Sequence, residues 1–256
     1  MSIEHLKLRE ELREFYEKYF QKSPRELDWY RVNCHDKANN VMHFCAPFAH
    51  DRIIDIGSGP GEVIRELSRS GFGTSFVAAD VGESGLAPLR ADPFKGLADV
   101  VDFDGIHLPF KDQEFDLAIL AHVIEHLDHP RIALAEAARI AKYVYVEVPL
   151  EYNFKNRRFS DPSAPFELGS TGHINFFNPK LARTLIKSSG YKLVASGVRH
   201  FRREVYTFHR PGISGLARFW IKESIHRIAP EFSTNFLNFH FGMVYTRSKN
   251  EGTPAT

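Results

Sequence analysis

The chain has few of the features that mark secreted or membrane-spanning proteins. It contains only two cysteines, Cys34 and Cys45, and they form neither a C-x-x-C pair nor a disulfide framework. The first twenty residues are charged throughout, which argues against a secretory signal. No segment approaches the roughly 20 apolar residues of a membrane span. We therefore expect two reduced thiols in a soluble, cytoplasmic protein.

An excess of charge of either sign is also absent. Lys and Arg number 33 and Asp and Glu 32, so the formal net charge is +1. This near balance argues against nucleic acid as a partner, because phosphate binding draws on a surplus of basic residues. The 256 residues are 43% hydrophobic and 25% charged, which is ordinary for one domain with a buried core, with or without extensions.

From residue 51 onward, short apolar segments alternate with amphipathic ones. Strands are predicted at 52–56, 75–80, 98–103, 115–121, 143–149, 191–198 and 239–248. Helices are predicted between them at 62–70, 131–141 and 178–190, the last with Asn178 as its cap. Strands separated by helices of about ten residues indicate a parallel, doubly wound α/β sheet.

The remaining segments extend this core at both ends. Helices are predicted at 3–20 and 35–48, and a strand at 203–210 is followed by a helix at 212–229. We predict an N-terminal helical extension or lid at 1–46 and a main domain at 47–248 with insertions at about 150–175 and 200–238. Residues 249–256 are expected to be disordered.

A glycine-rich turn and a later acid suggest a cofactor site. The sequence "GSGPG" at 57–61 lies between a predicted strand and helix, where open α/β sheets bind cofactors. Asp80 ends the second strand about 20 residues later, where an acid can accept both hydroxyls of a ribose. The glycine spacing differs from the dinucleotide pattern, and Pro60 removes a backbone donor that would face a pyrophosphate. A tight turn without a ligand remains the alternative.

Four segments occur in the order "RIIDIGSGPGE", "AAD", "DGIHLPFKDQEFDLAILAHVIEHLDHP" and "GHINFFNPKLARTLIKSSGY". Together they resemble the class I S-adenosylmethionine-dependent methyltransferases, particularly the branch with ubiquinone-biosynthesis-type enzymes, and the resemblance covers about residues 45–200. It implies a Rossmann-like, doubly wound, seven-stranded and mostly parallel sheet with helices on both faces and an antiparallel last strand. The implied cofactor is S-adenosyl-L-methionine, with S-adenosyl-L-homocysteine as product.

The resemblance also implies a role for each residue that matches these segments. The methionine part of the cofactor would lie against Asp55, Gly57, Ser58, Gly59 and Gly61. Asp80 would hold the ribose, Val81 would pack on the adenine, and Asp104 with Gly105 would bind the adenine edge. Asp102 is a rival for the role of Asp104. Ala121 and His122 would flank the sulfonium.

The stretch "HVIEHLDH" at 122–129 has more than one interpretation. Its first five residues match H-x-x-E-H, the pattern of an inverted zinc-peptidase helix. His122 directly follows a predicted buried strand, however, which places it at the mouth of the cofactor crevice and argues against a peptidase. Packing under the site, proton transfer by a histidine, and metal binding all stay open. We assign no metal, and retain as candidate ligands His122, Glu125, His126 and His173.

The predicted reaction is transfer of a methyl group to a small-molecule acceptor, expected at oxygen, by in-line displacement. Candidate catalytic residues are His126, His173 and His122, since a neutral imidazole can take a proton from an attacking hydroxyl. His173 could instead cap its own loop. Two alternatives are an RNA or protein methyltransferase, with or without a metal, and a cofactor-binding protein that has lost catalysis. We expect a monomer or homodimer. The aromatic and basic tail at 199–247 has three possible roles: a lid over the substrate, a dimer surface, or a contact with a membrane surface or RNA.

Overall fold

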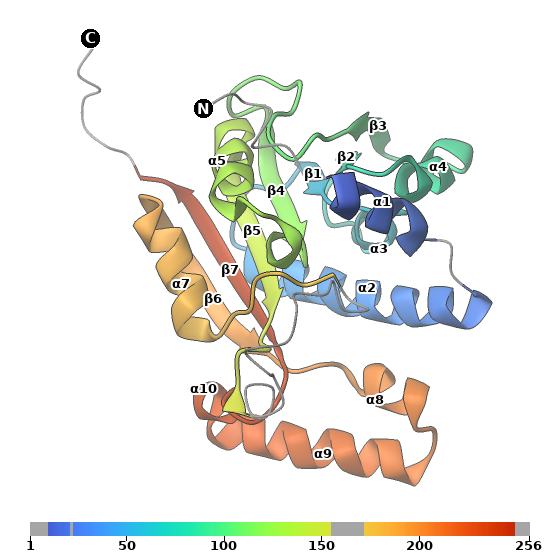
Figure 1. The fold of residues 1–256 in the computed structure, drawn as a ribbon, viewed down its shortest axis with the longest axis vertical. Helices are drawn as coiled ribbons and strands as arrows, with labels where there is room; N and C mark the ends of the chain where they lie inside the picture. Colours follow the sequence, from blue (N-terminus) through green and yellow to red (C-terminus); the bar gives the residue numbers. More distant parts are fainter. Residues whose placement is uncertain (1–9, 21–22, 155–171, 249–256) are drawn as a thin grey trace.

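A single seven-stranded sheet organises the chain, in the order β3-β2-β1-β4-β5-β7-β6 (Figure 1). The computed structural model describes residues 10–20, 23–154 and 172–248. The strands are β1 (Arg52–Ile56), β2 (Ser75–Asp80), β3 (Leu97–Asp102), β4 (Phe115–Ala121), β5 (Ala141–Pro149), β6 (Tyr191–Arg199) and β7 (His240–Arg247). All neighbours pair in parallel except β7, which is antiparallel to β5 and β6. The predicted fold class is confirmed.

Both faces of the sheet are buried because side chains alternate between two apolar layers. Ile54 and Ile56 of β1 belong to a core that includes α5 (Pro130–Ile140) and α7 (Pro179–Ser188). Ile53 faces the opposite core, built with α2 (Pro24–Cys45), α3 (Glu62–Arg69) and α4 (Glu83–Ala91). The central strands could therefore be recognised as continuous apolar segments. Within the described parts of the chain, no helix is both long and apolar enough to cross a membrane.

The second N-terminal helix begins earlier than the sequence pattern indicated. Ser23 Oγ accepts a hydrogen bond from the Glu26 N–H at 3.4 Å, and the Glu26 carboxylate accepts one from the Ser23 N–H at 2.9 Å. This capping box, with Pro24 at the first helical position, begins α2 eleven residues before the predicted start at residue 35. Helix α1 (Glu10–Tyr19) is the described part of the helix predicted at 3–20.

The strand predicted at 203–210 is wrong, because this segment forms the helix α8 (Arg203–His209). Tertiary contacts override its alternating pattern: Asp36 of α2 accepts the Arg202 N–H at 3.2 Å, and Phe208 packs on Trp29 with ring centroids 5.2 Å apart. The predicted helix at 212–229 is confirmed as α9 (Ile213–Ile228), followed by the short α10 (Pro230–Ser233). Most of the predicted insertion at 150–175, and the tail at 249–256, lie outside the described residues.

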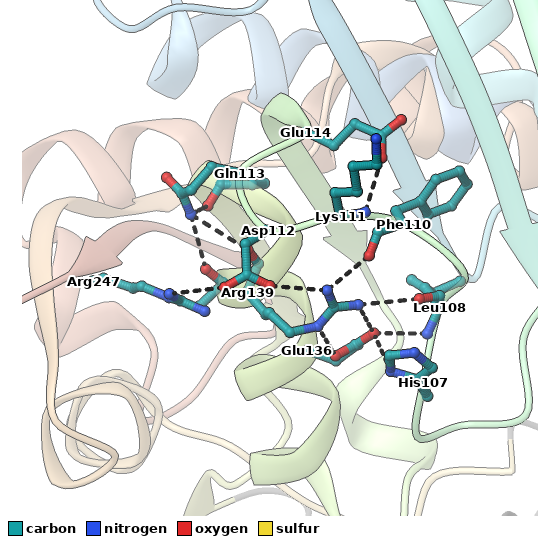
Figure 2. Close-up of polar contacts among 12 residues, drawn as sticks. His107, Leu108, Phe110, Lys111, Asp112, Gln113, Glu114, Glu136, Arg139 and Arg247 are labelled. Atoms are coloured by element: carbon teal, nitrogen blue, oxygen red, sulfur yellow. Dashed lines mark hydrogen bonds and ion pairs between the residues drawn. The ribbon is translucent and has the colours of Figure 1, made fainter. Parts of the chain in front are cut away.

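The loop between β3 and β4 is fixed to α5 by one arginine. Figure 2 shows Arg139 donating to the carbonyls of Leu108 (3.0 Å) and Phe110 (2.7 Å) while it pairs with Glu136. Glu136 in turn accepts the Leu108 N–H at 2.7 Å. Backbone groups that would otherwise lose their partners on burial are thus satisfied by side chains. These contacts fix the backbone on both sides of Pro109 in "LPF". This tripeptide belongs to the third of the four segments that carried the resemblance.

Two paired glycines allow α2 to pack closely on the sheet. Gly242 of β7 lies opposite Gly197 of β6, and the Phe44 ring of α2 rests against both. A β-carbon at position 242 would lie 2.5 Å from Phe44 Cε2, whereas one at position 197 would lie 3.3 Å from Phe44 Cζ. The glycines therefore set how closely the helix approaches β6 and β7.

We expect Gly242→Ala to destabilise the protein by about 1–3 kcal/mol, because the buried Phe44 ring cannot move without disturbing its neighbours. Gly197→Ala is the matched control and should cost clearly less, since its contact is only slightly tight. Urea unfolding of both variants measures the difference. Equal stability of the two variants would contradict this account of the packing.

Candidate functional site

A cavity opens where β1, β2 and β4 end, at the carboxyl edge of the sheet. Its wall is mostly apolar and aromatic, with a few polar side chains among them. The lining residues are Tyr16, Phe20, Tyr30, Lys37, Gly57, Asp80, Val81, Phe103, Ala121, His122, Val123, His126, Leu127 and His173. An apolar pocket with a small number of placed polar groups is the usual form of a small-molecule site.

The glycine turn adopts the left-handed backbone that its sequence predicted. Gly57, Gly59 and Gly61 have φ of +78°, +50° and +73°, a region that glycine tolerates best. A β-carbon at Gly61 would lie 2.6 Å from Leu89, so close packing of α4 also requires glycine there. The N–H groups of Gly57 and Ser58 both donate to the Ala79 carbonyl, which joins the turn to β2.

Asp80 holds this turn by its side chain. One carboxylate oxygen accepts the Gly59 N–H at 2.6 Å, and the other accepts the N–H groups of Val81 (2.7 Å) and Gly82 (3.3 Å). Burial raises the pKa of Asp80, and these three backbone donors oppose that rise. The carboxylate is therefore fixed at the cavity wall by the backbone that it organises.

Asp55, near the end of β1, is more deeply buried than Asp80. Its side chain is 2% exposed, and within the described residues its Oδ2 atom has no hydrogen-bond partner. Burial raises the pKa of Asp55 to about 7, against the opposing effect of the Lys37 ammonium. Near neutral pH this carboxyl group therefore exists in both protonation states.

Five of the eleven residues that the resemblance assigned to the cofactor line the cavity. Asp80, Val81, Ala121 and His122 line the cavity with Gly57. Asp104 and Gly105 are not among the lining residues; the Asp104 carboxylate accepts the N–H groups of Ile106 and His107 at 2.9 Å. Their rival Asp102 is largely exposed and pairs with Arg90 at 3.3 Å. Phe103, between the two acids, faces the cavity instead.

"HVIEHLDH" does not form the helix that a zinc peptidase requires. Its residues 124–126 make one short 3-10 turn, η2 (Ile124–His126), after the end of β4. His122 has φ of +63°, a strained backbone for a residue with a β-carbon, and its N–H donates to the Glu147 carbonyl at 2.9 Å. The strand before this segment therefore decides its geometry, as the sequence indicated, and turns His122 into the cavity.

His126 and His173 both line the cavity, and their rings are in contact with centroids 4.8 Å apart. His126 Nδ1 lies 3.1 Å from the Gly172 carbonyl, so this nitrogen is the donor and Nε2 is left with its lone pair. Burial lowers the pKa of His126 to about 3, which keeps the ring neutral. For His173, burial is outweighed by Glu151 at 2.7 Å, and the pKa is raised. The pKa values of the two histidines are thus shifted in opposite directions.

Glu125 lies beside these rings and is fully buried. Neither of its carboxylate oxygens has a hydrogen-bond partner within the described residues. Burial raises its pKa to about 7, and the nearby His173 opposes this rise. The four candidate ligands from the sequence therefore divide: Glu125, His126 and His173 form one cluster, whereas His122 joins Glu147 and His240 in another.

Sequence reasoning missed the second cluster, and it predicted an N-terminal lid without naming the residues of that segment that line the cavity. Glu147 interrupts the apolar β5 segment "YVYVEVP", and a charged residue in a buried strand was an available signal. Lys37 lines the cavity and donates to the Ala121 carbonyl at 3.2 Å. Phe20 and Tyr30 cover Gly59 from α1 and α2, and no pattern in the sequence indicates this contact.

Comparison with protein families gives a match over most of the chain. The family described as "Methyltransferase domain" matches residues 5–196. A ubiquinone/menaquinone biosynthesis C-methyltransferase of Ruegeria sp. is 33% identical over 106 residues, which are 40% of this chain and 42% of the relative. The corresponding protein of Bartonella henselae is 29% identical over 189 residues, 70% of each chain. The matched regions thus span about two fifths to seven tenths of these relatives' lengths.

Solved structures show the same fold. A chain from the complex between the Haloferax volcanii Trm112 methyltransferase activator and a methyltransferase superposes with a TM-score of 0.63 at 15% identity, covering 93% of this chain and 98% of its own. At this identity the likeness establishes the architecture alone. The expected oxygen acceptor finds no support among the sequence relatives, because they are named C-methyltransferases.

The raised pKa of Asp55 predicts a pH-dependent penalty on stability. Folded Asp55 keeps its proton up to about pH 7, whereas the unfolded chain loses it near pH 4, so stability falls as the pH rises through this interval. We expect Asp55→Asn to raise the free energy of unfolding at pH 8 by up to about 4 kcal/mol, at 1.36 kcal/mol per pKa unit. At pH 4 the effect should be small. Urea unfolding at both pH values measures it.

Asp116→Asn is the matched control. Asp116 is bonded to Lys142 at 2.7 Å, and its pKa is lowered despite partial burial, so it stabilises the protein at pH values above the unfolded pKa. Its removal should therefore destabilise the protein at pH 8, opposite in sign to Asp55→Asn. A pH-independent effect of Asp55→Asn would show that the buried carboxyl does not titrate as described.

Proposed function

Because the chain belongs to the class I S-adenosylmethionine-dependent methyltransferases, we propose that it methylates a carbon atom of a small, electron-rich aromatic acceptor such as a quinol. The observation that carries this proposal is the shared cavity: the Asp80-clamped glycine turn and the neutral imidazole of His126 line the same space. A methyl donor and a proton acceptor can therefore be placed next to one acceptor molecule.

The donor side rests on the turn and the acid at the carboxyl ends of β1 and β2. We assign the methionine part of S-adenosylmethionine to Asp55 and to residues 57–61, the ribose hydroxyls to Asp80, and the adenine face to Val81. Ala121 and His122 would flank the sulfonium. Asp104 and Gly105 remain the proposed adenine-edge residues, with Phe103 beside them in the cavity wall. The cofactor supplies the reactive methyl group.

The acceptor side rests on the apolar wall and the histidines. Tyr16, Phe20 and Leu127 line the cavity and suit the face of a flat ring. A ring carbon becomes nucleophilic when a neighbouring hydroxyl loses its proton, and the Nε2 lone pair of His126 can accept that proton. Because burial lowers the pKa of His126 to about 3, this transfer requires that the oxyanion be stabilised. His173, paired with Glu151, carries positive charge more readily and can stabilise the resulting oxyanion.

The chain's part in the reaction is alignment, exclusion of water and removal of this proton. The methyl group moves by in-line displacement, which requires the acceptor carbon on the side of the sulfonium opposite the leaving sulfur. Helix α1, packed on α4, brings Tyr16 into the cavity wall, and Phe20, directly after the helix, lines the same wall. Lys37 adds a positive charge near the oxygen that is deprotonated.

The donor site predicts the effect of removing Asp80. We expect Asp80→Ala to weaken binding of S-adenosylmethionine by roughly 1–3 kcal/mol, because the ribose loses a charged acceptor and the Gly59 N–H loses its partner. Asp102→Ala is the control and should leave affinity unchanged, since this exposed acid pairs only with the surface Arg90 among the described contacts. Isothermal titration calorimetry measures both. Unchanged affinity in Asp80→Ala would refute the ribose assignment.

The acceptor proposal predicts the position of the transferred methyl group. With labelled S-adenosylmethionine and 1,4-naphthoquinol as probe, we expect a new C–CH3 group and no methyl ether, identified by NMR of the product. His126→Gln should lower kcat by about 10²–10⁴-fold through loss of the base, with cofactor affinity retained.

His129→Gln is the matched variant, because His129 lies in the same segment but is exposed and outside the cavity. It should be as active as the unmodified protein. An O-methylated product, or full activity in His126→Gln, would refute the assigned reaction or the assigned base respectively.

A further inference from the structure

Three side chains of metal-ligand type converge behind the cavity, on the sheet face that α2 covers. His122 directly follows β4, Glu147 lies in β5, and His240 begins β7. These three strands are neighbours in the sheet, with α2 packed across β5 and β7 (Figure 1). The set differs from the cluster of Glu125, His126 and His173 that faces the acceptor side.

The three inner atoms form a nearly equilateral triangle. His122 Nε2 and His240 Nδ1 are 2.9 Å apart, and each lies 3.1 Å from Glu147 Oε1. Ligands at about 2.1 Å from a cation are about 3.0 Å apart when they meet at right angles and about 3.4 Å apart in a tetrahedron. The observed edges match adjacent ligands on one face of an octahedral site.

The two imidazole nitrogens share a hydrogen bond, whereas Glu147 Oε1 is left without one among the described residues. The residue is fully buried, and in the described part of the chain this oxygen accepts no hydrogen bond of good geometry, although two imidazole nitrogens lie at 3.1 Å. A buried carboxylate oxygen without a donor is costly. A cation shared by all three atoms would satisfy the oxygen and both nitrogens together.

Each of the three groups also has a polar neighbour on its outer side, although among the described residues neither imidazole forms a hydrogen bond there. His240 Nε2 lies 3.4 Å from the buried Asp36 carboxylate, and His122 Nδ1 lies 3.5 Å from Glu125. The second oxygen of Glu147 accepts the hydroxyl of Tyr145 at 2.6 Å and the amide of Asn40 at 2.9 Å. Metal-binding histidines ordinarily present their other ring nitrogen to a carboxylate in this way, which fixes the tautomer.

We propose that His122, Glu147 and His240 form a binding site for a divalent first-row transition-metal ion. Two imidazoles and one carboxylate suit zinc, iron(II), manganese or cobalt, whereas magnesium and calcium prefer ligand sets of oxygen alone. His122 is also part of the cavity wall, so the ion would be reached from the cavity. The site is defined by binding alone and holds whether or not the proposed methyl transfer is correct.

Titration of the metal-free protein with Co²⁺ and Zn²⁺ tests the proposal. We expect one equivalent of Co²⁺ to bind saturably, with visible d–d absorption, and Zn²⁺ to displace it and raise the melting temperature. Glu147→Gln converts the carboxylate into a neutral amide, in which one of the two oxygens becomes an NH2 group. His122→Gln removes the imidazole that lines the cavity. Both should weaken Co²⁺ binding at least about tenfold.

His173→Gln is the control, because it alters the other histidine cluster and should leave Co²⁺ affinity unchanged. If Glu147→Gln does not fold, His122→Gln decides, since His122 is partly exposed and tolerates substitution better. The absence of saturable binding up to about 1 mM Co²⁺ and Zn²⁺ would overturn the proposal and leave a hydrogen-bonded network. Binding that His122→Gln retains, or that His173→Gln also abolishes, would overturn the assignment to these three residues.

Discussion

The hydrogen bond from the Gly59 N–H to the Asp80 carboxylate is the contact on which the site depends. It joins the turn after β1 to the end of β2 and fixes both against the cavity. The same carboxylate accepts two further N–H groups, so its orientation is fixed. These hydrogen bonds also offset the cost of burying it. A parallel sheet makes this possible, because the carboxyl ends of neighbouring strands meet at one edge.

Buried charge is concentrated at that edge. Four buried acids lie near the carboxyl ends of β1, β2, β4 and β5 and are at most 7% exposed: Asp55, Asp80, Glu125 and Glu147. Burial favours the neutral carboxyl, and the pKa values of Asp55 and Glu125 rise to about 7. Glu147 behaves differently: His240 and His122 lower its pKa despite complete burial. Such a density of perturbed groups is characteristic of functional sites.

The fold could largely be predicted because the two sheet faces are buried and their strands are continuous apolar segments. The glycine turn could be predicted because positive φ favours glycine, and the place of Asp80 at the end of β2 could be predicted from the strand pattern. The failures have physical reasons. The segment 203–210 is a helix because α2 supplies the contacts of Arg202 and Phe208, and the cluster at Glu147 joins residues more than a hundred positions apart. The domain boundaries at 46/47 and 248/249 stay predictions.

The sequence by itself determined the order of the seven sheet strands, the turn at 57–61 and the place of His122 after β4. These follow from local periodicity and from the backbone that glycine permits. Only the tertiary structure decided which histidine faces which acid. "HVIEHLDH" supplies His122 to one cluster and Glu125 and His126 to another, because the strained φ of His122 and the turn η2 direct neighbouring side chains to different sides. Such directions depend on the strands packed alongside, and a linear pattern does not contain them.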